Sequence, residues 1–236
     1  MSAEPPSRIS ENLRAVRDRM ARAADRSGRA ESDVQLVAVT KYAPLDSVRA
    51  LVDLGVVTLG ESRPQQFAQR VAELDRAVDW HFIGHLQRNK VRMVVPHASL
   101  IHSIDSLRLL ERVNQAASET DTSPRVLLEV NVSGEGSKDG FSPESLDREW
   151  EQLIAMTPAR IVGLMTMAPA GDDPEQARPC FRALRHLRDE LARRSPASID
   201  LRELSMGMSG DFEVAVEEGA TLIRVGSALF AGIAAN

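Results

Sequence analysis

Residues 34–60 read VQLVAVTKYAPLDSVRALVDLGVVTLG and contain an apolar β-branched run, a helix-compatible stretch and a second β-branched run. The first run, residues 34–40, predicts a buried strand. Pro44 begins a helix, and Gly55 ends it as a glycine just beyond a helix C-terminus commonly does. Residues 56–60 predict the next strand. A strand, a helix and a strand in this order form the repeating unit of a parallel sheet.

The same alternation recurs along the chain after an amphipathic helix at about residues 7–27. The predicted strands are residues 34–40, 56–60, 80–84, 100–104, 125–132, 161–168, 203–208 and 221–225. Helix caps are expected at Ser106, Ser142 and Asp173. Eight repeats without a break in composition favour a single domain, residues 1–236, folded as an α/β protein of the closed (β/α)8 TIM barrel type. The alternative is a doubly wound open sheet, but the glycine fingerprint G-x-G-x-x-G is missing after the first strand.

Composition narrows the classes of function. The chain has 236 residues, 43% of them hydrophobic, which suffices for one core. Its net charge of −5 argues against a nucleic-acid partner, because binding phosphate backbones needs clustered positive charge. With Cys180 as the one cysteine, no disulfide or cysteine metal site forms within the chain, and a cytoplasmic location fits. We see no secretory leader and no apolar run of about 18 residues, so we expect a soluble protein without a membrane partner.

Polar residues concentrate where the predicted strands end, and barrel enzymes place their chemistry at those ends. Lys41 follows the first strand and is one of only three lysines among 29 lysine and arginine residues. A lysine amine can attack a carbonyl carbon, whereas arginine does not lose its proton usefully. Lys41 shares strand parity with Val37 and Val39, so it points into the barrel mouth if these valines fill the interior. From spacing alone, a lysine that only reaches solvent is the alternative.

The turn RVGS at residues 224–227, after the last strand, suits a phosphate. It combines backbone N–H groups with a hydroxyl, and barrels often hold phosphate at this place. Ser205 and Ser209 offer further hydroxyls beside it. We expect them only to assist, because Asp211 and Glu213 would repel an anion seated over the helix that follows them. An ordinary turn that closes the barrel is the alternative.

His81 and His85 raise the question of a metal site, with Asp105 or Glu129 as oxygen ligands. Their spacing suits one face of a helix, but the segment predicts a strand, in which the two residues are about 13 Å apart. We therefore expect no metal, and we expect His81 to be a packed or hydrogen-bonded interior histidine.

Eight motifs in one order resemble the YggS-like, or PROSC, family of pyridoxal phosphate homeostasis proteins, and they cover nearly the whole chain. The motifs are LVAVTKYAP (36–44), GESRPQQ (60–66), WHFIGHLQRNK (80–90), HSIDS (102–106), EVNVSGEGSKDGF (129–141), GLMTMAP (163–169), LSMGMSGDFEVAVEEGAT (204–221) and IRVGSALF (223–230).

The resemblance implies a barrel like the N-terminal domain of alanine racemase, with pyridoxal 5'-phosphate (PLP) as its cofactor. By this resemblance Lys41 corresponds to the lysine that forms a Schiff base with PLP, and Arg224 to an arginine directed at the pyridine nitrogen. The cofactor-binding residues expected are Lys41, Arg224, Gly226, Ser227, Ser205, Ser209, Ser62 and His81. Ser62 stands where the family usually has asparagine, which leaves a direct contact at that position open.

The resemblance also implies a PLP carrier or buffer rather than an enzyme, with PLP-requiring apoenzymes as recipients and a monomeric state. A cationic arginine at the ring nitrogen weakens the ring as an electron sink. The alternative is a PLP-dependent racemase or lyase, with Lys41 as one base and Tyr42, His81 or Lys138 as the other. A metal-dependent or phosphosugar barrel enzyme is a third alternative. The role of Lys90 stays open.

Overall fold

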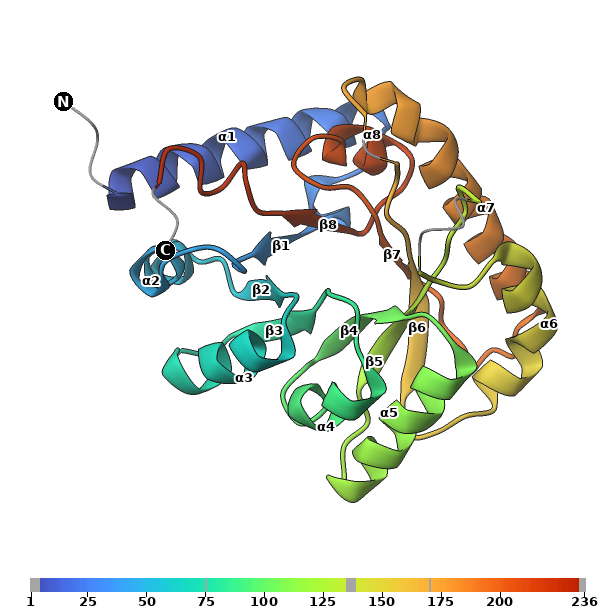
Figure 1. Ribbon diagram of the computed structural model, residues 1–236. Coiled ribbons are helices and arrows are strands. Elements are labelled where there is room, and N and C mark those ends of the chain that lie inside the picture. The colour runs from blue at the N-terminus through green and yellow to red at the C-terminus, as the bar shows by residue number, and fades with distance from the viewer. Residues whose placement is uncertain (1–4, 75, 135–138, 170, 234–236) are drawn as a thin grey trace.

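Eight parallel strands close into a barrel in chain order, with β8 (Leu222–Val225) pairing to β1 (Gln35–Val39). The computed structural model describes residues 5–74, 76–134, 139–169 and 171–233. Figure 1 shows the helices arranged around the strands. The predicted barrel is therefore confirmed, and the open sheet is excluded because the strands pair in chain order and the last strand pairs with the first, which leaves no edge strand.

The elements follow one another as strand and helix. The other strands are β2 (Thr58–Glu61), β3 (Asp79–Phe82), β4 (Leu100–Ile104), β5 (Arg125–Glu129), β6 (Arg160–Met165) and β7 (Glu203–Ser205). The helices are α1 (Pro5–Arg26), α2 (Leu45–Asp53), α3 (Pro64–Glu73), α4 (Val91–Val94), α5 (Leu107–Glu119), α6 (Pro143–Ile154), α7 (Arg178–Arg194) and α8 (Phe212–Glu217), with 3-10 turns η1 (Glu31–Asp33), η2 (Arg88–Lys90) and η3 (Pro174–Ala177). None of these helices, over the part of the chain described, is long and apolar enough to cross a membrane.

The helix α1 takes the place of the helix that would follow β8 in a regular barrel. It packs against α8 and α2, and Figure 1 shows it beside the segment after β8. The Asn12 amide donates hydrogen bonds to the carbonyl oxygens of Leu229 and Ala231, each 3.0 Å long. The first helix of the chain thereby completes the outer ring and holds the segment that follows the last strand.

Apolar side chains fill two regions, one inside the barrel and one between the strands and the helices. The interior cluster consists of Val37, Leu100, Leu127, Met165 and Leu222. Because side chains alternate along a strand, residues two positions further on point inward at a higher level. This parity leads from Val37 to Val39 and Lys41, both of which line a cavity at the C-terminal ends of the strands. The parity argument for Lys41 therefore agrees with the structure.

Three predicted strands extend three residues beyond the C-terminal ends that the structure shows. β5 ends at Glu129, β6 at Met165 and β7 at Ser205. Beyond β7, Gly207 has a φ of 91°, and a Cβ atom there would lie 2.5 Å from the Cβ atom of Ala215. Only glycine fits this turn. The strand geometry therefore stops before Gly207, although the apolar residues Met206 and Met208 continue the strand pattern in the sequence. The residues beyond these strand ends form the mouth of the barrel.

Candidate functional site

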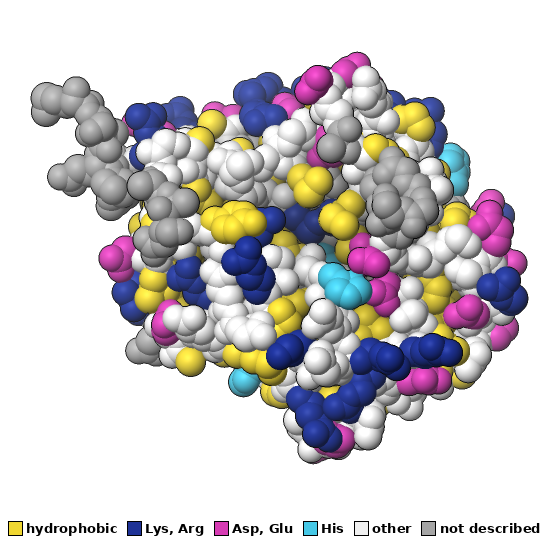
Figure 2. Space-filling view, viewed as in Figure 1, with side chains coloured by type: hydrophobic (Ala, Val, Ile, Leu, Met, Phe, Trp, Pro, Cys, Tyr) yellow, Lys and Arg dark blue, Asp and Glu magenta, His cyan; other side chains and the backbone are white. Residues whose placement is uncertain are grey.

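The C-terminal ends of β1, β2, β7 and β8 enclose a cavity of about 640 Å³. Figure 2 shows hydrophobic and charged side chains gathered around the middle of this face. The lining residues that bear on function are Val39, Lys41, Tyr42, Ser62, Met167, Met208, Ser209, Arg224, Gly226 and Ser227. Six of the eight residues predicted for cofactor binding are among them.

Lys41 lies in the turn that follows β1. The side-chain amide of Gln66 donates a 2.8 Å hydrogen bond to the Lys41 carbonyl oxygen and so holds this turn. The Lys41 Nζ atom lies 5.1 Å from the centre of the Tyr42 ring. It forms no hydrogen bond or ion pair with the residues that the structure describes. The amine is therefore available to a ligand in the cavity.

The turn after β8 presents backbone N–H groups to the cavity. The N–H groups of Gly226 and Ala228 both donate to the Ser209 hydroxyl, each at 3.3 Å. Two donors that meet at one oxygen atom are what an oxyanion requires. A Cβ atom on Gly226 would lie 3.1 Å from the Val39 carbonyl oxygen, so a larger residue would push the turn away from β1. The Ser227 side chain is exposed and lines the same cavity.

Arg224 supplies a buried cation at the floor of the cavity. Its Nη1 donates to the Ser205 hydroxyl at 2.6 Å, and its Nη2 donates to the Thr166 carbonyl oxygen at 3.0 Å. Burial lowers the pKa of Arg224 to about 10, while the nearby carboxyl groups of Glu129 and Asp211 oppose this change. The guanidinium therefore stays charged at neutral pH, and its two bonds fix its plane.

Acidic side chains lie across the barrel, beside β4 and β5. Glu129 is 5% exposed, and burial, followed by the charge of Asp105, raises its pKa to about 7. His85 Nδ1 lies 3.4 Å from Asp105 and 3.2 Å from Asp139. Among the residues described, no group of three or more His, Cys, Asp and Glu side chains is placed to hold a metal ion. His81 does not lie with His85 beside these acidic residues. It is buried in the barrel interior, where it contacts Asp79 and His102.

Comparison with known proteins gives a consistent family. The model of the alanine racemase N-terminal domain matches residues 9–233. A pyridoxal phosphate homeostasis protein of Aquifex aeolicus is 42% identical over 93% of this chain and 96% of its own length. The human protein of the same name is 38% identical over 92% of this chain and 84% of its own length.

The chain belongs to the pyridoxal phosphate homeostasis protein family.

Solved structures agree with this family assignment. PipY of Synechococcus elongatus, described with PLP bound, is 37% identical, has a TM-score of 0.83 and covers 94% of this chain and 99% of its own. Alanine racemase of Clostridium difficile is 16% identical with a TM-score of 0.74, and this chain covers 56% of its length. That second likeness shows a shared barrel only.

Two residues predicted for cofactor binding lie beneath the cavity in this family member. Ser205 is fully buried between Arg224 and His102, with its hydroxyl 2.8 Å from His102 Nδ1. His81 is 1% exposed, and its ring lies 3.0 Å from His102 Nε2. Neither lines the cavity described above. His81 is the interior, hydrogen-bonded histidine expected from the sequence, while Ser205 is placed as a support for Arg224 rather than as a wall of the phosphate turn.

Sequence reasoning assigned no role to Asp79 or to Thr166 in this family member. Asp79 lies 3.2 Å from His81, and Thr166 accepts from Arg224 through its backbone. The available signal for Asp79 was its parity, because it precedes His81 by two residues and so shares its face of the strand. A backbone acceptor such as Thr166 leaves no signal in the sequence. Lys138, named as an alternative base, lies outside the described residues.

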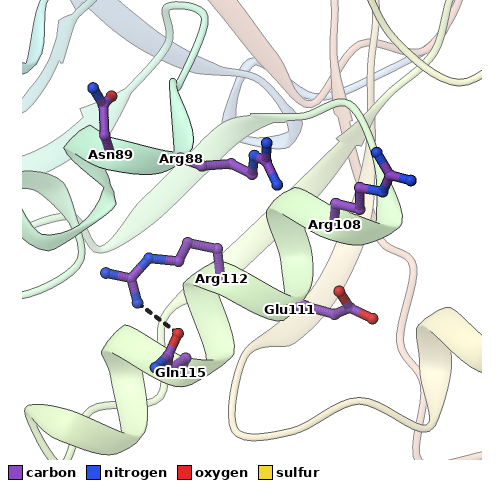
Figure 3. A pocket seen from close by; sticks show the side chains of 6 residues that line it. All are labelled: Arg88, Asn89, Arg108, Glu111, Arg112 and Gln115. Atoms are coloured by element: carbon purple, nitrogen blue, oxygen red, sulfur yellow. Dashed lines mark hydrogen bonds between the residues drawn. The ribbon is translucent and has the colours of Figure 1, made fainter.

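A second hollow, of about 530 Å³, lies on the outer surface between η2 and α5. Figure 3 shows that its lining residues are Arg88, Asn89, Arg108, Glu111, Arg112 and Gln115. Arg112 donates a 2.8 Å hydrogen bond to Gln115, and Figure 2 shows basic side chains gathered over α4 and α5. The hollow contains no lysine and no buried polar group, so the barrel mouth is the better candidate site.

Proposed function

We propose that this chain binds PLP covalently at the barrel mouth and takes part in PLP homeostasis as a carrier or buffer of the cofactor. The observation that carries the proposal is the convergence on one cavity of Lys41 Nζ, the buried cation Arg224 and the N–H groups of Gly226 and Ala228. Such a set suits a ligand with an aldehyde, a ring nitrogen and a phosphate. The names of the relatives and the PLP described in PipY support the same ligand.

Each residue of the cavity has a separate task in this proposal. The cofactor supplies an aldehyde carbon that a neutral lysine amine attacks with loss of water. Lys41 contributes that amine. The N–H groups of the β8 turn, together with the hydroxyl of Ser227, would hold the phosphate, and the Ser209 hydroxyl, released from these N–H groups, would lie beside it. Arg224 would face the ring nitrogen and keep it unprotonated, and Ser62 would border the ring.

We propose that binding, and not turnover, is the activity of this site. Racemisation requires two bases on opposite faces of the substrate carbon. Of the described cavity residues, the titratable pair beside the covalent position is Lys41 and Tyr42, and the Lys41 amine lies 5.1 Å from the Tyr42 ring centre. Two adjacent groups that contact each other lie on one side of a ligand. This geometry favours a carrier over the alternative racemase or lyase.

The rim of the cavity supports a protein recipient. Tyr42 is 58% exposed, Met167 43% and Met208 40%, although large apolar side chains are usually covered. We propose that PLP-requiring apoenzymes contact this rim when the cofactor passes to them. We propose further that the protein is a monomer in the cytoplasm, where its single, buried Cys180 stays reduced.

The covalent attachment is tested with the visible absorption spectrum of protein incubated with PLP, followed by borohydride reduction and peptide mass mapping. We expect an absorption band that reduction removes and a stable adduct on Lys41 in the wild type. Lys41→Ala should lose both, whereas Lys90→Ala, which changes a lysine outside the cavity, should keep both. An adduct distributed over surface amines and unchanged in Lys41→Ala would contradict the proposal.

The carrier role is tested with α-deuterated amino acids. Loaded protein should leave the deuterium in place after long incubation, because no second base among the described cavity residues lies on the face opposite Lys41. Washout of the label by the wild type but not by Lys41→Ala would establish a racemase or lyase instead.

A further inference from the structure

A continuous series of hydrogen bonds crosses the barrel interior and ends at Arg224. It runs from Asp79 at the start of β3 through His81 and His102 to Ser205 on β7. The distances are 3.2 Å from Asp79 to His81 Nε2, 3.0 Å from His81 Nδ1 to His102 Nε2, 2.8 Å from His102 Nδ1 to Ser205, and 2.6 Å from Ser205 to Arg224. His81, His102 and Ser205 are at most 1% exposed.

When each of the two rings carries one proton, the two ends of the series fix the direction of every bond in it. A guanidinium can only donate hydrogen bonds, and an ionised carboxylate can only accept them. The bond to His81 holds the pKa of Asp79 below its ordinary value, so its carboxylate is ionised at neutral pH. Arg224 therefore donates to Ser205, and the single proton of the serine hydroxyl goes to His102 Nδ1.

The same reasoning sets the proton on each histidine. His102 carries its proton on Nε2 and donates to His81 Nδ1, so His81 carries its own on Nε2 and donates to Asp79. With one proton on each ring, the opposite order would place an unprotonated His81 nitrogen against a carboxylate. Burial, and then the neighbouring His81 and Arg224, lower the pKa of His102 well below its ordinary value. In this arrangement each ring is held in one tautomer.

This polar series occupies space that aliphatic side chains could fill. The layer next to it consists of Val37, Leu100, Leu127, Met165 and Leu222. Buried polar groups rarely stabilise a core more than well-packed apolar groups of the same volume. A series with three such residues, His81, His102 and Ser205, that ends on the one buried guanidinium of the cavity therefore points to a task at that guanidinium.

We infer that Asp79, His81, His102 and Ser205 are positioning residues that act together through the barrel and hold Arg224 as a fixed cation at the floor of the cofactor cavity. The inference rests on the proposed function. In a series that donates in one direction, each bond polarises the next, and the effect reaches the last donor. Asp79, 38% exposed at the N-terminal end of the barrel, thus influences a ligand bound at the C-terminal end.

Asp79→Asn is the most informative variant. Asparagine has nearly the same shape and can still accept a hydrogen bond from His81, but it has no charge and can also donate. The control is Asp200→Asn, because Asp200 is an exposed aspartate paired with Arg202 outside the series. Asp79 also faces Arg125 and bonds to Ser99, and the substitution removes the negative charge from both of these interactions.

The first readout needs no cofactor. Histidine ring ¹⁵N shifts of cofactor-free protein, assigned with His81→Gln and His102→Gln, should show one neutral Nε2–H tautomer for each of the two rings. The second tautomer should become populated in Asp79→Asn and not in Asp200→Asn. A charged ring or an Nδ1–H tautomer of His102 in the wild type at pH 7 would overturn the inference, whatever the protein binds.

The second readout uses protein loaded with PLP. Asp79→Asn should shift the visible band of the bound cofactor and change its dissociation rate by at least about twofold, the size expected of coupling between distant sites. Asp200→Asn should leave both unchanged. An identical spectrum and rate in Asp79→Asn would mean that the series only fills space. If the wild type itself binds no PLP, the proposed function fails, and the tautomers still decide whether the series has the direction inferred here.

Discussion

Glu129 is one residue whose burial makes the stability of the protein depend on pH. Its folded-state pKa of about 7 lies above its ordinary value of 4.5. Between these two values the folded protein keeps a proton that the unfolded chain has released. The stability contributed by protonated Glu129 is therefore fully present below about pH 4.5 and is lost as the pH rises through about 7.

Glu129→Gln should remove this dependence. We expect the variant to gain up to about 3 kcal/mol relative to the wild type at pH 8 and little at pH 4.5, since one pKa unit corresponds to about 1.4 kcal/mol. Urea unfolding from pH 4.5 to 8 measures the difference. Glu111→Gln, which changes an exposed glutamate, should follow the wild-type curve. Parallel curves for Glu129→Gln and the wild type would contradict the predicted burial effect.

Ser227 separates recognition of the phosphate from recognition of the ring. Its hydroxyl belongs to the turn after β8, away from the covalent position at Lys41. Hydrogen bonds to charged groups contribute about 1.5–3 kcal/mol, so Ser227→Ala should weaken PLP binding by about tenfold or more. Binding of pyridoxal, which lacks the phosphate, should not change. Equal losses for the two ligands in a spectroscopic titration would show that Ser227 does not contact the phosphate.

For single residues, the sequence predicted which side chains have a functional role better than it predicted which side chains they contact. Parity along β1 predicted that Lys41 faces the cavity, and the structure agrees. Ser205 was expected beside the phosphate, but its hydroxyl lies between Arg224 and His102. The difference arises because His102 meets Ser205 across the barrel, from strands 103 residues apart. No local pattern records such a contact.

Among the elements, the seam between β6 and β7 depends on one glycine. A Cβ atom on Gly163 would lie 1.9 Å from the carbonyl oxygen of Glu203, and φ at Gly163 is 158°. The Glu203 backbone cannot retreat without separating the two strands. Gly163→Ala should therefore destabilise the barrel by about 1–3 kcal/mol or more.

Thermal unfolding measures this effect, and Gly210→Ala is the matched control. A Cβ atom on Gly210 has nothing within 4 Å, so its stability should stay within about 0.5 kcal/mol of the wild type. Similar melting temperatures for Gly163→Ala and the wild type would mean that the seam can open locally at little cost.

Helix starts were predicted well, and strand ends were not. Ser106 and Ser142 accept the expected capping bonds, from the N–H groups of Leu109 and Ser145. A cap is a local interaction between residues three apart, so the sequence contains it. β5 and β6 end early because their last predicted residues turn into the loops of the mouth. Apolar residues such as Met167 continue the strand pattern there although they are exposed at the rim.

For the whole molecule, ligand binding and folding should be linked. A ligand that binds only the folded state at 100 times its Kd stabilises a protein by about 2.7 kcal/mol. For a chain of this size, PLP should raise Tm by roughly 5–10 °C. Lys41→Ala should lose most of the rise, because the covalent bond contributes to the affinity. A rise of the same size in that variant would place the binding energy elsewhere.

The closed barrel followed from the sequence because its eight strand–helix repeats are each local, and closure requires only that the last strand meet the first. The role of α1 did not follow. Its amphipathic pattern predicted a helix, but its place beside the segment after β8 depends on Asn12 reaching Leu229, a residue 217 positions later. A long-range contact of that kind is decided by the assembled barrel.

The position of the Ser209 hydroxyl affects how a phosphate group enters and leaves the cavity. It already satisfies the N–H groups of Gly226 and Ala228, each at 3.3 Å. An incoming phosphate must displace that hydroxyl, so binding gains only the difference between two sets of bonds, and departure leaves no donor unsatisfied. A site arranged in this way binds the phosphate less tightly but releases it more easily. It suits a protein that passes its ligand on, because these N–H groups have a hydrogen-bond acceptor both before and after the ligand leaves.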